Sequence, residues 1–146
     1  MQKRGRGRPR KGAPKRTKQI PTKADPRLIF LQETILDNPY CIHKPTKKQT
    51  EFLLRNELEV LYGGAAAGGK SDALLMAALQ YHWVPNYAAL ILRRTYADLA
   101  LSGAIMDRSL QWLSGSDAHW NSSGHKWTFP SGATLTFGYL ESERDK

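Results

Sequence analysis

The chain has little cysteine and no long apolar segment. Its 146 residues include one cysteine, Cys41, which excludes an intramolecular disulfide and a cysteine-rich zinc site. No apolar run approaches the ~20 residues that a membrane-spanning helix needs. The basic N-terminus is not followed by the apolar segment of a secretory signal peptide. These absences predict a soluble protein in a reducing, intracellular compartment.

Acidic residues are absent from the first 23 positions, which hold ten lysine or arginine side chains. Because the whole chain carries a formal net charge of +9 and this segment carries +10, the remaining residues together carry −1. The composition therefore indicates a nearly neutral domain with a cationic tail. Tails of this kind usually bind nucleic acid or another polyanion.

Large apolar side chains are also scarce in residues 1–24, so this segment is predicted to be disordered. The segment contains the core of an AT-hook, formed by Arg6, Gly7, Arg8, Pro9 and Arg10. A narrow, extended Arg-Gly-Arg segment fits the minor groove of A·T-rich DNA, where the negative potential is strongest. The alternatives are a low-complexity cationic tail that binds polyanions without preference, and an extension left over from another start site.

The most informative stretch is residues 63–71, G-G-A-A-A-G-G-K-S. Its last eight residues fit the pattern G-x-x-x-x-G-K-[ST] of the phosphate-binding loop of NTPases. The mostly apolar residues 58–62 predict a buried strand before the loop. Residues 72–83 after it are rich in helix formers until Val84-Pro85 ends the helix. Strand, glycine-rich turn and helix is the order that a phosphate-binding loop requires.

Small residues in such a loop let a polyphosphate approach the backbone. Unpaired N–H groups and the dipole of the following helix favour an anion there. The predicted nucleotide-binding residues are Gly64, Ala65, Ala66, Ala67, Gly68, Gly69, Lys70 and Ser71. Lys70 is the predicted catalytic contact to the β- and γ-phosphates of ATP, and the Ser71 hydroxyl the predicted ligand of Mg²⁺. The alternative is a flexible glycine-rich loop beside an incidental lysine.

Two helices are predicted before the loop. Asp25-Pro26 is typical of an N-cap followed by the first helical residue, and residues 27–36 carry a broad apolar face. A second helix begins near Thr46, and Gln49 within it has two interpretations. In several P-loop motor families, a glutamine shortly before the phosphate-loop strand contacts adenine. Thr46-x-x-Gln49 is also a capping box, and the two roles do not exclude each other.

After the loop, residues 88–92 predict a second apolar strand that leads into Arg93 and Arg94. Open α/β sheets bind ligands at the C-terminal ends of their strands, so one of these arginines could contact the γ-phosphate or DNA. The alternative is a solvated surface pair.

The remaining residues predict a helix, a loop and a hairpin. Thr95-x-x-Asp98 can cap a helix over residues 96–113, which Gly103 weakens in its middle. Residues 114–124 predict a loop. Residues 126–139 alternate polar and apolar side chains around a Pro-Ser-Gly turn, which is typical of a β-hairpin.

Four segments in this order resemble the N-terminal part of the ATPase domain of tailed-phage terminase large subunits. They are PTKKQTEFL at 45–53, EVLYGGAAAGGKS at 59–71, LILRRTYADL at 90–99 and TFPSGATL at 128–135. The resemblance covers roughly residues 42–143. It implies an α/β fold, the additional-strand P-loop NTPase domain, which the family follows with an RNase H-like nuclease domain.

The resemblance also implies roles for individual residues and partners. It makes residues 64–71 the Walker A loop, Gln49 the adenine contact, and Arg93 or Arg94 a catalytic contact to nucleotide or DNA. It implies Mg²⁺-ATP as the cofactor and double-stranded DNA, a portal protein and a small terminase subunit as partners. A homo-oligomeric ring in the cytoplasm of a bacterial host, transiently on the procapsid, follows from the same resemblance.

The sequence departs from the family pattern after the hairpin. Family members carry there an apolar strand ending in Asp-Glu, whose Asp supports Mg²⁺ and whose Glu activates water. Here Glu141, Glu143 and Asp145 follow no long apolar run before Lys146. We therefore expect residues 25–146 to be an incomplete ATPase domain, from a truncated or split gene or a fragment, with little ATP turnover alone. The alternatives are a DNA-binding module with a degenerate P-loop domain and another helicase-like P-loop ATPase.

Overall fold

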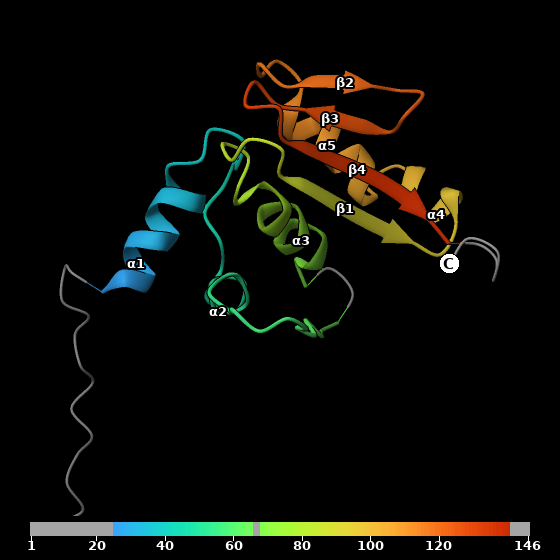
Figure 1. The fold of residues 1–146 in the computed structure, drawn as a ribbon. Coiled ribbons are helices and arrows are strands. Elements are labelled where there is room, and N and C mark those ends of the chain that lie inside the picture. Colours follow the sequence, from blue (N-terminus) through green and yellow to red (C-terminus); the bar gives the residue numbers. More distant parts are fainter. Residues whose placement is uncertain (1–24, 66–67, 141–146) are drawn as a thin grey trace, which may run out of the picture.

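The computed structural model describes residues 25–65 and 68–140 (Figure 1). The predicted tail, residues 1–24 with the AT-hook pattern at 6–10, lies outside the described residues, as do Ala66, Ala67 and residues 141–146. The described residues form a mixed α/β fold with one four-stranded sheet of order β1-β4-β3-β2. None of their helices has the length and apolarity needed to span a membrane.

The sheet combines parallel and antiparallel pairing. Its strands are β1 (Ala88–Arg93), β2 (His119–Asn121), β3 (Lys126–Thr128) and β4 (Thr134–Tyr139). β1 pairs with β4 in parallel, and β3 pairs with β4 and β2 in antiparallel fashion. The predicted strand at 88–92 and the predicted hairpin are confirmed. The loop predicted for residues 114–124 is partly wrong, because residues 119–121 form the strand β2, in which Trp120 pairs with Trp127 and packs against it with ring centroids 5.0 Å apart.

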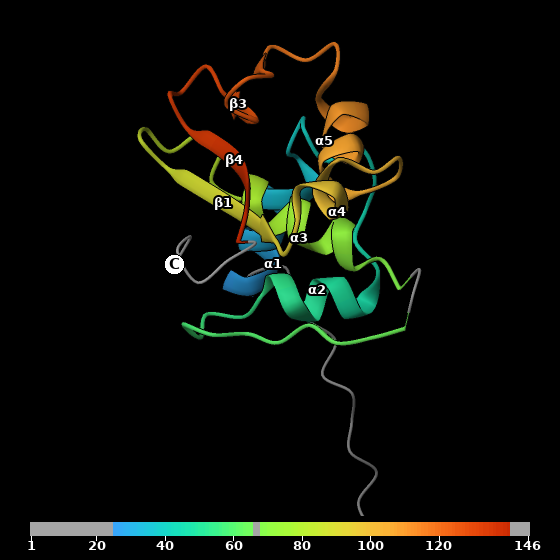
Figure 2. The same ribbon diagram turned by 90° about the vertical axis from the view of Figure 1, so that its right-hand side faces the viewer.

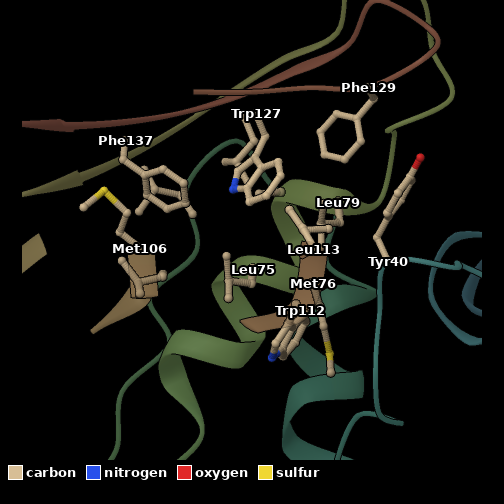
Figure 3. Close-up of a cluster of buried hydrophobic side chains, with 14 of the residues drawn as sticks. Tyr40, Leu75, Met76, Leu79, Met106, Trp112, Leu113, Trp127, Phe129 and Phe137 are labelled. Carbon is tan, nitrogen blue, oxygen red and sulfur yellow. The ribbon is translucent and has the colours of Figure 1, made fainter. Parts of the chain in front are cut away.

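One face of the sheet carries the hydrophobic core. The helices α3 (Lys70–Leu79), α4 (Tyr96–Ala100) and α5 (Ile105–Leu113) lie on this side of β1 and β4 (Figure 2). Alternate strand residues point into it, so that Ile91 lies opposite Phe137 in the register of the two strands. The large buried side chains of the helices and the hairpin meet here (Figure 3): Leu75, Met76, Leu79, Met106, Trp112, Leu113, Trp127, Phe129 and Phe137.

The opposite face of β1 and β4 is more open. Leu90 and Leu92 are exposed there and lie over Gly138 of the neighbouring strand. A Cβ atom at Gly138 would come within 2.9 Å of the Leu92 Cδ2 atom, so the absence of a side chain lets the leucine pack against the strand. The outer edge of β1 pairs with no strand among residues 25–65 and 68–140.

Two short helical segments precede the loop region. α1 (Pro26–Leu31) begins at Asp25, whose carboxylate accepts a hydrogen bond from the Arg27 N–H at 2.9 Å, and continues into the π-helical turn η1 (Gln32–Leu36). α2 (Lys47–Leu53) begins at Thr46 with the predicted capping box. The predicted N-terminal caps of both helices are therefore confirmed.

The single helix predicted over residues 96–113 is wrong, because the chain forms α4 and α5 with a break between them. Gly103 lies in this break with a φ of +75°, a left-handed conformation that a helix interior does not contain. Its N–H is bound by the Asp107 carboxylate of α5 at 2.8 Å. After the break, α5 contributes apolar side chains to the core, and its Ser109 hydroxyl accepts a hydrogen bond from the Trp127 Nε1–H of β3 at 3.0 Å.

The strand predicted at residues 58–62 is not formed. This segment is irregular, and its side chains Leu58 and Leu61 are fully exposed. It runs beside α2, where Tyr62 packs on Phe52 with ring centroids 4.9 Å apart. A strand needs a neighbour for its backbone N–H and C=O groups, and no described strand lies beside this segment. The additional-strand P-loop architecture and the division at residue 24 stay predictions.

Candidate functional site

The glycine-rich segment that matches the phosphate-loop pattern leads into the N-terminus of α3. Gly69 is the N-cap residue and adopts a left-handed conformation with a φ of +71°. The first i to i−4 hydrogen bond of the helix runs from the Ala73 N–H to the Gly69 carbonyl at 3.0 Å. The N–H groups of Lys70, Ser71 and Asp72 precede that bond, so they have no acceptor within the helix. This end of α3 can therefore hold an anion.

Lys70 turns back onto the loop. Its Nζ atom donates to the carbonyl oxygens of Gly64 at 2.8 Å and Ala65 at 2.6 Å. The same loop closes on itself through a hydrogen bond from the Gly68 N–H to the Ala65 carbonyl at 3.2 Å. Lys70 therefore connects the start of α3 to the preceding segment through two carbonyl oxygens.

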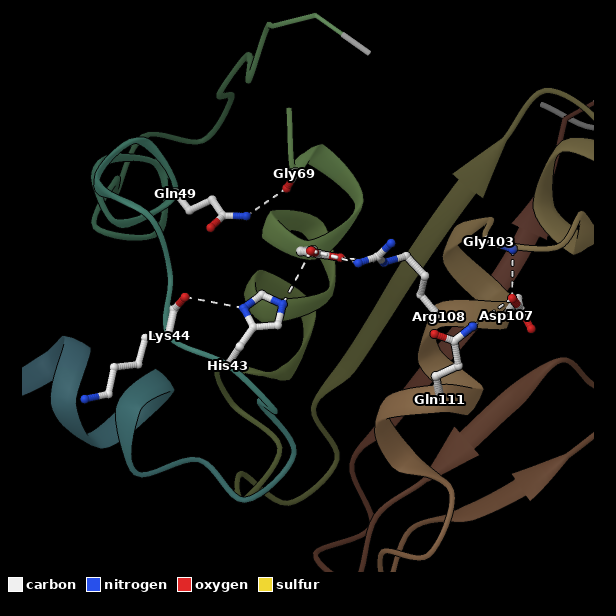
Figure 4. A network of polar contacts seen from close by, with 9 residues as sticks. His43, Lys44, Gln49, Gly69, Gly103, Asp107, Arg108 and Gln111 are labelled. Carbon is white, nitrogen blue, oxygen red and sulfur yellow. Dashed lines mark hydrogen bonds and ion pairs between the residues drawn. The ribbon is translucent and has the colours of Figure 1, made fainter. Parts of the chain in front are cut away.

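Gln49 connects α2 to the loop (Figure 4). Its Nε2 atom donates to the Gly69 carbonyl at 2.9 Å, and its Oε1 atom accepts from the Thr46 N–H at 2.8 Å. The Thr46 hydroxyl in turn accepts from the Gln49 N–H at 3.4 Å, which completes the predicted capping box. Only 2% of Gln49 is exposed, and both ends of its amide contact protein. The adenine contact stays a prediction.

A cavity of about 400 Å³ opens beside the N-terminus of α3. The residues that line it come from the loop, from α3 and from the α4–α5 region: Gly68, Gly69, Lys70, Ser71, Asp72, Gly103 and Arg108. The predicted phosphate and Mg²⁺ contacts at Lys70 and Ser71 therefore share one cavity. Ala66 and Ala67, which the motif includes, lie outside the described residues.

Two charged residues in this cavity wall were not singled out by the sequence. Arg108 of α5 forms an ion pair with the Asp72 carboxylate through one edge of its guanidinium: Nη2 donates to Oδ2 at 3.0 Å, and Nε lies 2.6 Å from Oδ1. These residues are 36 positions apart in the sequence. Arg108 is one of several polar residues of α5, and no motif sets it apart. No local spacing connects them, so only the packing of α5 beside α3 could identify the pair.

Arg93 and Arg94 lie elsewhere. Both are exposed at and just beyond the C-terminal end of β1, where the Arg93 carbonyl accepts a hydrogen bond from the Leu140 N–H at 3.0 Å. Neither lines the cavity beside Lys70. Their contact with nucleotide or DNA stays a prediction. The arginine that lines the cavity together with the loop is Arg108.

Cys41 and His43 do not form a metal site in the described part of the chain. Residues 25–65 and 68–140 contain no group of three or more His, Cys, Asp or Glu side chains that could hold a metal ion. Burial raises the pKa of the Cys41 thiol to about 12, so the thiol stays protonated at neutral pH. His43 instead approaches the Asp72 carboxylate, with its Nε2 atom 3.4 Å from Oδ2.

Neither a protein-family model nor a curated protein nor a solved structure matches this chain. The function is therefore argued from the motif and the geometry of the site.

Proposed function

We propose that this chain is the nucleotide-binding part of a viral DNA-packaging motor of the terminase type. The observation that carries the proposal is the phosphate-loop pattern at residues 64–71, which leads into a helix N-terminus and a cavity lined by Lys70 and Ser71. In this class of protein, Mg²⁺-ATP hydrolysis moves double-stranded DNA into a procapsid.

Each element of the cavity has a chemical task in this proposal. The backbone N–H groups at the start of α3 hold phosphate oxygens, since they have no acceptor in the helix. Lys70 exchanges its bonds to the Gly64 and Ala65 carbonyls for bonds to the polyphosphate. The Ser71 hydroxyl supplies one protein ligand to Mg²⁺. One such ligand fits this ion, which takes its other oxygens from water and phosphate.

Calorimetric titration of the full chain with ADP in the presence of Mg²⁺ tests the nucleotide site. We expect saturable, Mg²⁺-dependent binding that Lys70→Ala abolishes. Lys47→Ala is the matched control, because Lys47 is an exposed lysine in the first turn of α2 and should leave the affinity unchanged. Equal affinity in the wild-type chain and the Lys70 variant would reject the site.

The proposal extends to DNA through the cationic tail. Residues 1–23 carry ten basic side chains and no acidic one, which suits binding to duplex phosphates. Each phosphate that the tail neutralises should add about 0.9 to the slope of log K against log salt concentration. Fluorescence anisotropy with A·T and G·C duplexes measures both the slope and the base preference.

A matched pair of variants separates the AT-hook from a general cationic tail. Replacing Arg6, Arg8 and Arg10 by alanine should lower the affinity for both duplexes and remove any A·T preference. Replacing Lys15, Arg16 and Lys18 removes the same charge outside the hook pattern and should preserve the preference. DNA binding without any nucleotide binding would favour the alternative function, a DNA-binding module.

The remaining parts of the proposal are taken from what terminase large subunits do as a class. They are assembly into a ring, contact with a portal protein and a small terminase subunit, and action in the cytoplasm of a bacterial host. Co-expression with a candidate portal protein and analysis of the complex by size-exclusion chromatography would test the first of these contacts.

A further inference from the structure

The ion pair between Asp72 and Arg108 lies in the wall of the candidate phosphate site. The Asp72 side chain is 13% exposed and the Arg108 side chain 37% exposed. Asp72 sits in the first turn of α3, two positions after Lys70, so its negative charge lies where an anion is expected to bind. A free carboxylate at this point would repel a polyphosphate.

Arg108 neutralises the Asp72 carboxylate and still has N–H donors that this ion pair does not use. A guanidinium group has five N–H donors, and the contacts to Asp72 use the Nε and one Nη2 position. No other hydrogen bond from this guanidinium forms within residues 25–65 and 68–140. Since Arg108 also lines the cavity with Lys70, the remaining N–H groups are available to a ligand there.

We propose that Arg108 is a second phosphate-binding cation of the nucleotide site, one that also offsets the negative charge of Asp72 there. This inference rests on the proposed function of the loop and adds a residue that the phosphate-loop pattern does not contain. The planar fork of arginine suits two phosphate oxygens, whereas Lys70 contacts them as a point charge. His43 lies near the same carboxylate, with its Nε2 atom 3.4 Å from Oδ2, the oxygen that also accepts from Arg108 Nη2.

A purely structural ion pair makes a different prediction from a phosphate-binding arginine. Arg108→Gln and Asp72→Asn each remove one charge of the pair; Asn keeps the shape of Asp, and Gln is a shorter polar side chain than Arg. If the pair only joins α3 to α5, the two variants should lose stability and nucleotide affinity to similar extents. If Arg108 binds phosphate, Arg108→Gln weakens binding, while Asp72→Asn preserves or strengthens it, because a negative charge leaves the site and the arginine stays.

The experiment is a calorimetric titration of the full chain with a non-hydrolysable ATP analogue, adenylyl imidodiphosphate, in Mg²⁺. We expect Arg108→Gln to lose about tenfold or more in affinity, as for a charge-assisted hydrogen bond, and Asp72→Asn to lose none. Arg108→Lys keeps the charge without the fork and should fall between the two. Circular dichroism melts of each variant report whether the fold is retained.

The outcomes separate this inference from the proposed function. Binding by the wild-type chain that Lys70→Ala abolishes and Arg108→Gln leaves unchanged rejects the role of Arg108 alone. Equal losses in Arg108→Gln and Asp72→Asn reject it as well. No binding by the folded wild-type chain rejects the nucleotide site itself. If Arg108→Gln does not fold, the nucleotide affinities of Arg108→Lys and Asp72→Asn are compared instead. A lower affinity in Asp72→Asn than in the wild-type chain then overturns the inference.

Discussion

The side-chain amide of Gln49 donates a hydrogen bond at 2.9 Å to the carbonyl of Gly69, the N-cap residue of α3. The same side chain caps α2 through Thr46, so one buried glutamine joins the start of two helices. Because Gly69 precedes Lys70 directly, this contact fixes the loop end from which the lysine and the helix N–H groups extend.

Replacing Gln49 by alanine should destabilise the chain. The change removes the partly buried hydrogen bonds to the Thr46 N–H and the Gly69 carbonyl, although that carbonyl still accepts from Ala73; the loss of two ordinary hydrogen bonds costs about 1–2 kcal/mol. Urea denaturation measures the loss. The control is Gln111→Ala, because Gln111 is exposed and its side chain donates to Asp107 on the helix surface, so its effect should stay within about 0.5 kcal/mol. Similar midpoints for the two variants would contradict the linking role of Gln49.

Gly69 and Gly63 provide a matched pair in the glycine-rich segment. A Cβ atom at Gly69 would lie 2.8 Å from the Gln49 Nε2 atom, and the φ of +71° disfavours any L-residue by about 1–2 kcal/mol. At Gly63 a Cβ atom would meet nothing within 4 Å. Gly69→Ala should therefore lower the melting temperature and weaken nucleotide binding, whereas Gly63→Ala should do neither. Thermal melts and calorimetry check both, and a neutral Gly69→Ala would show that the loop end is not constrained.

His82 should make stability fall in acid. Burial lowers its pKa below the ordinary value of 6.5, against smaller opposite effects of the Leu79 carbonyl and Asp117. The unfolded chain therefore binds the proton more readily than the folded one. Stability from this source is fully present above about pH 6.5 and is lost as the pH falls toward the lower folded-state pKa.

Melting temperatures measured between pH 7.5 and 5 test the role of His82. We expect the decrease over this range to be smaller in His82→Gln than in the wild-type chain. His119→Gln serves as the control, because His119 is exposed on the edge strand β2 and should leave the decrease as it is. An unchanged decrease in His82→Gln would assign the acid sensitivity to other groups.

Exposed apolar residues should make the chain self-associate. Leu58 and Leu61 are fully exposed, and the outer edge of β1 pairs with no strand among the described residues. Exposed apolar segments and free strand edges favour association. Sedimentation velocity over a range of concentrations should show association that Leu58→Ser with Leu61→Ser reduces without lowering the melting temperature. Leu101→Ser, which changes an exposed leucine in another part of the fold, should leave the association unchanged. A wild-type monomer at every concentration would contradict this prediction.

Several local features could be predicted from the sequence because their cause lies within a few residues. The Thr46 capping box forms as its spacing indicates, and Thr95 caps α4 by accepting a hydrogen bond from the Asp98 N–H at 3.1 Å. The hairpin forms around Gly132, whose φ of +87° needs glycine. The loop pattern likewise singles out Lys70 and Ser71 from local spacing; they line one cavity, and their contacts to nucleotide stay predictions.

Only the tertiary structure determined the features that depend on residues far apart in the sequence. The apolar residues 58–62 have the composition of a strand, yet they form none, because a strand depends on a neighbour that no local pattern supplies. The sequence marked Gly103 as a weak point, but only the structure shows that α4 ends before it and α5 begins after it, with Ile105, Met106 and Leu113 of α5 in the core. Arg108 reaches Asp72 across 36 positions only because α5 lies beside α3, so the charge that completes the cavity wall follows from packing and not from spacing.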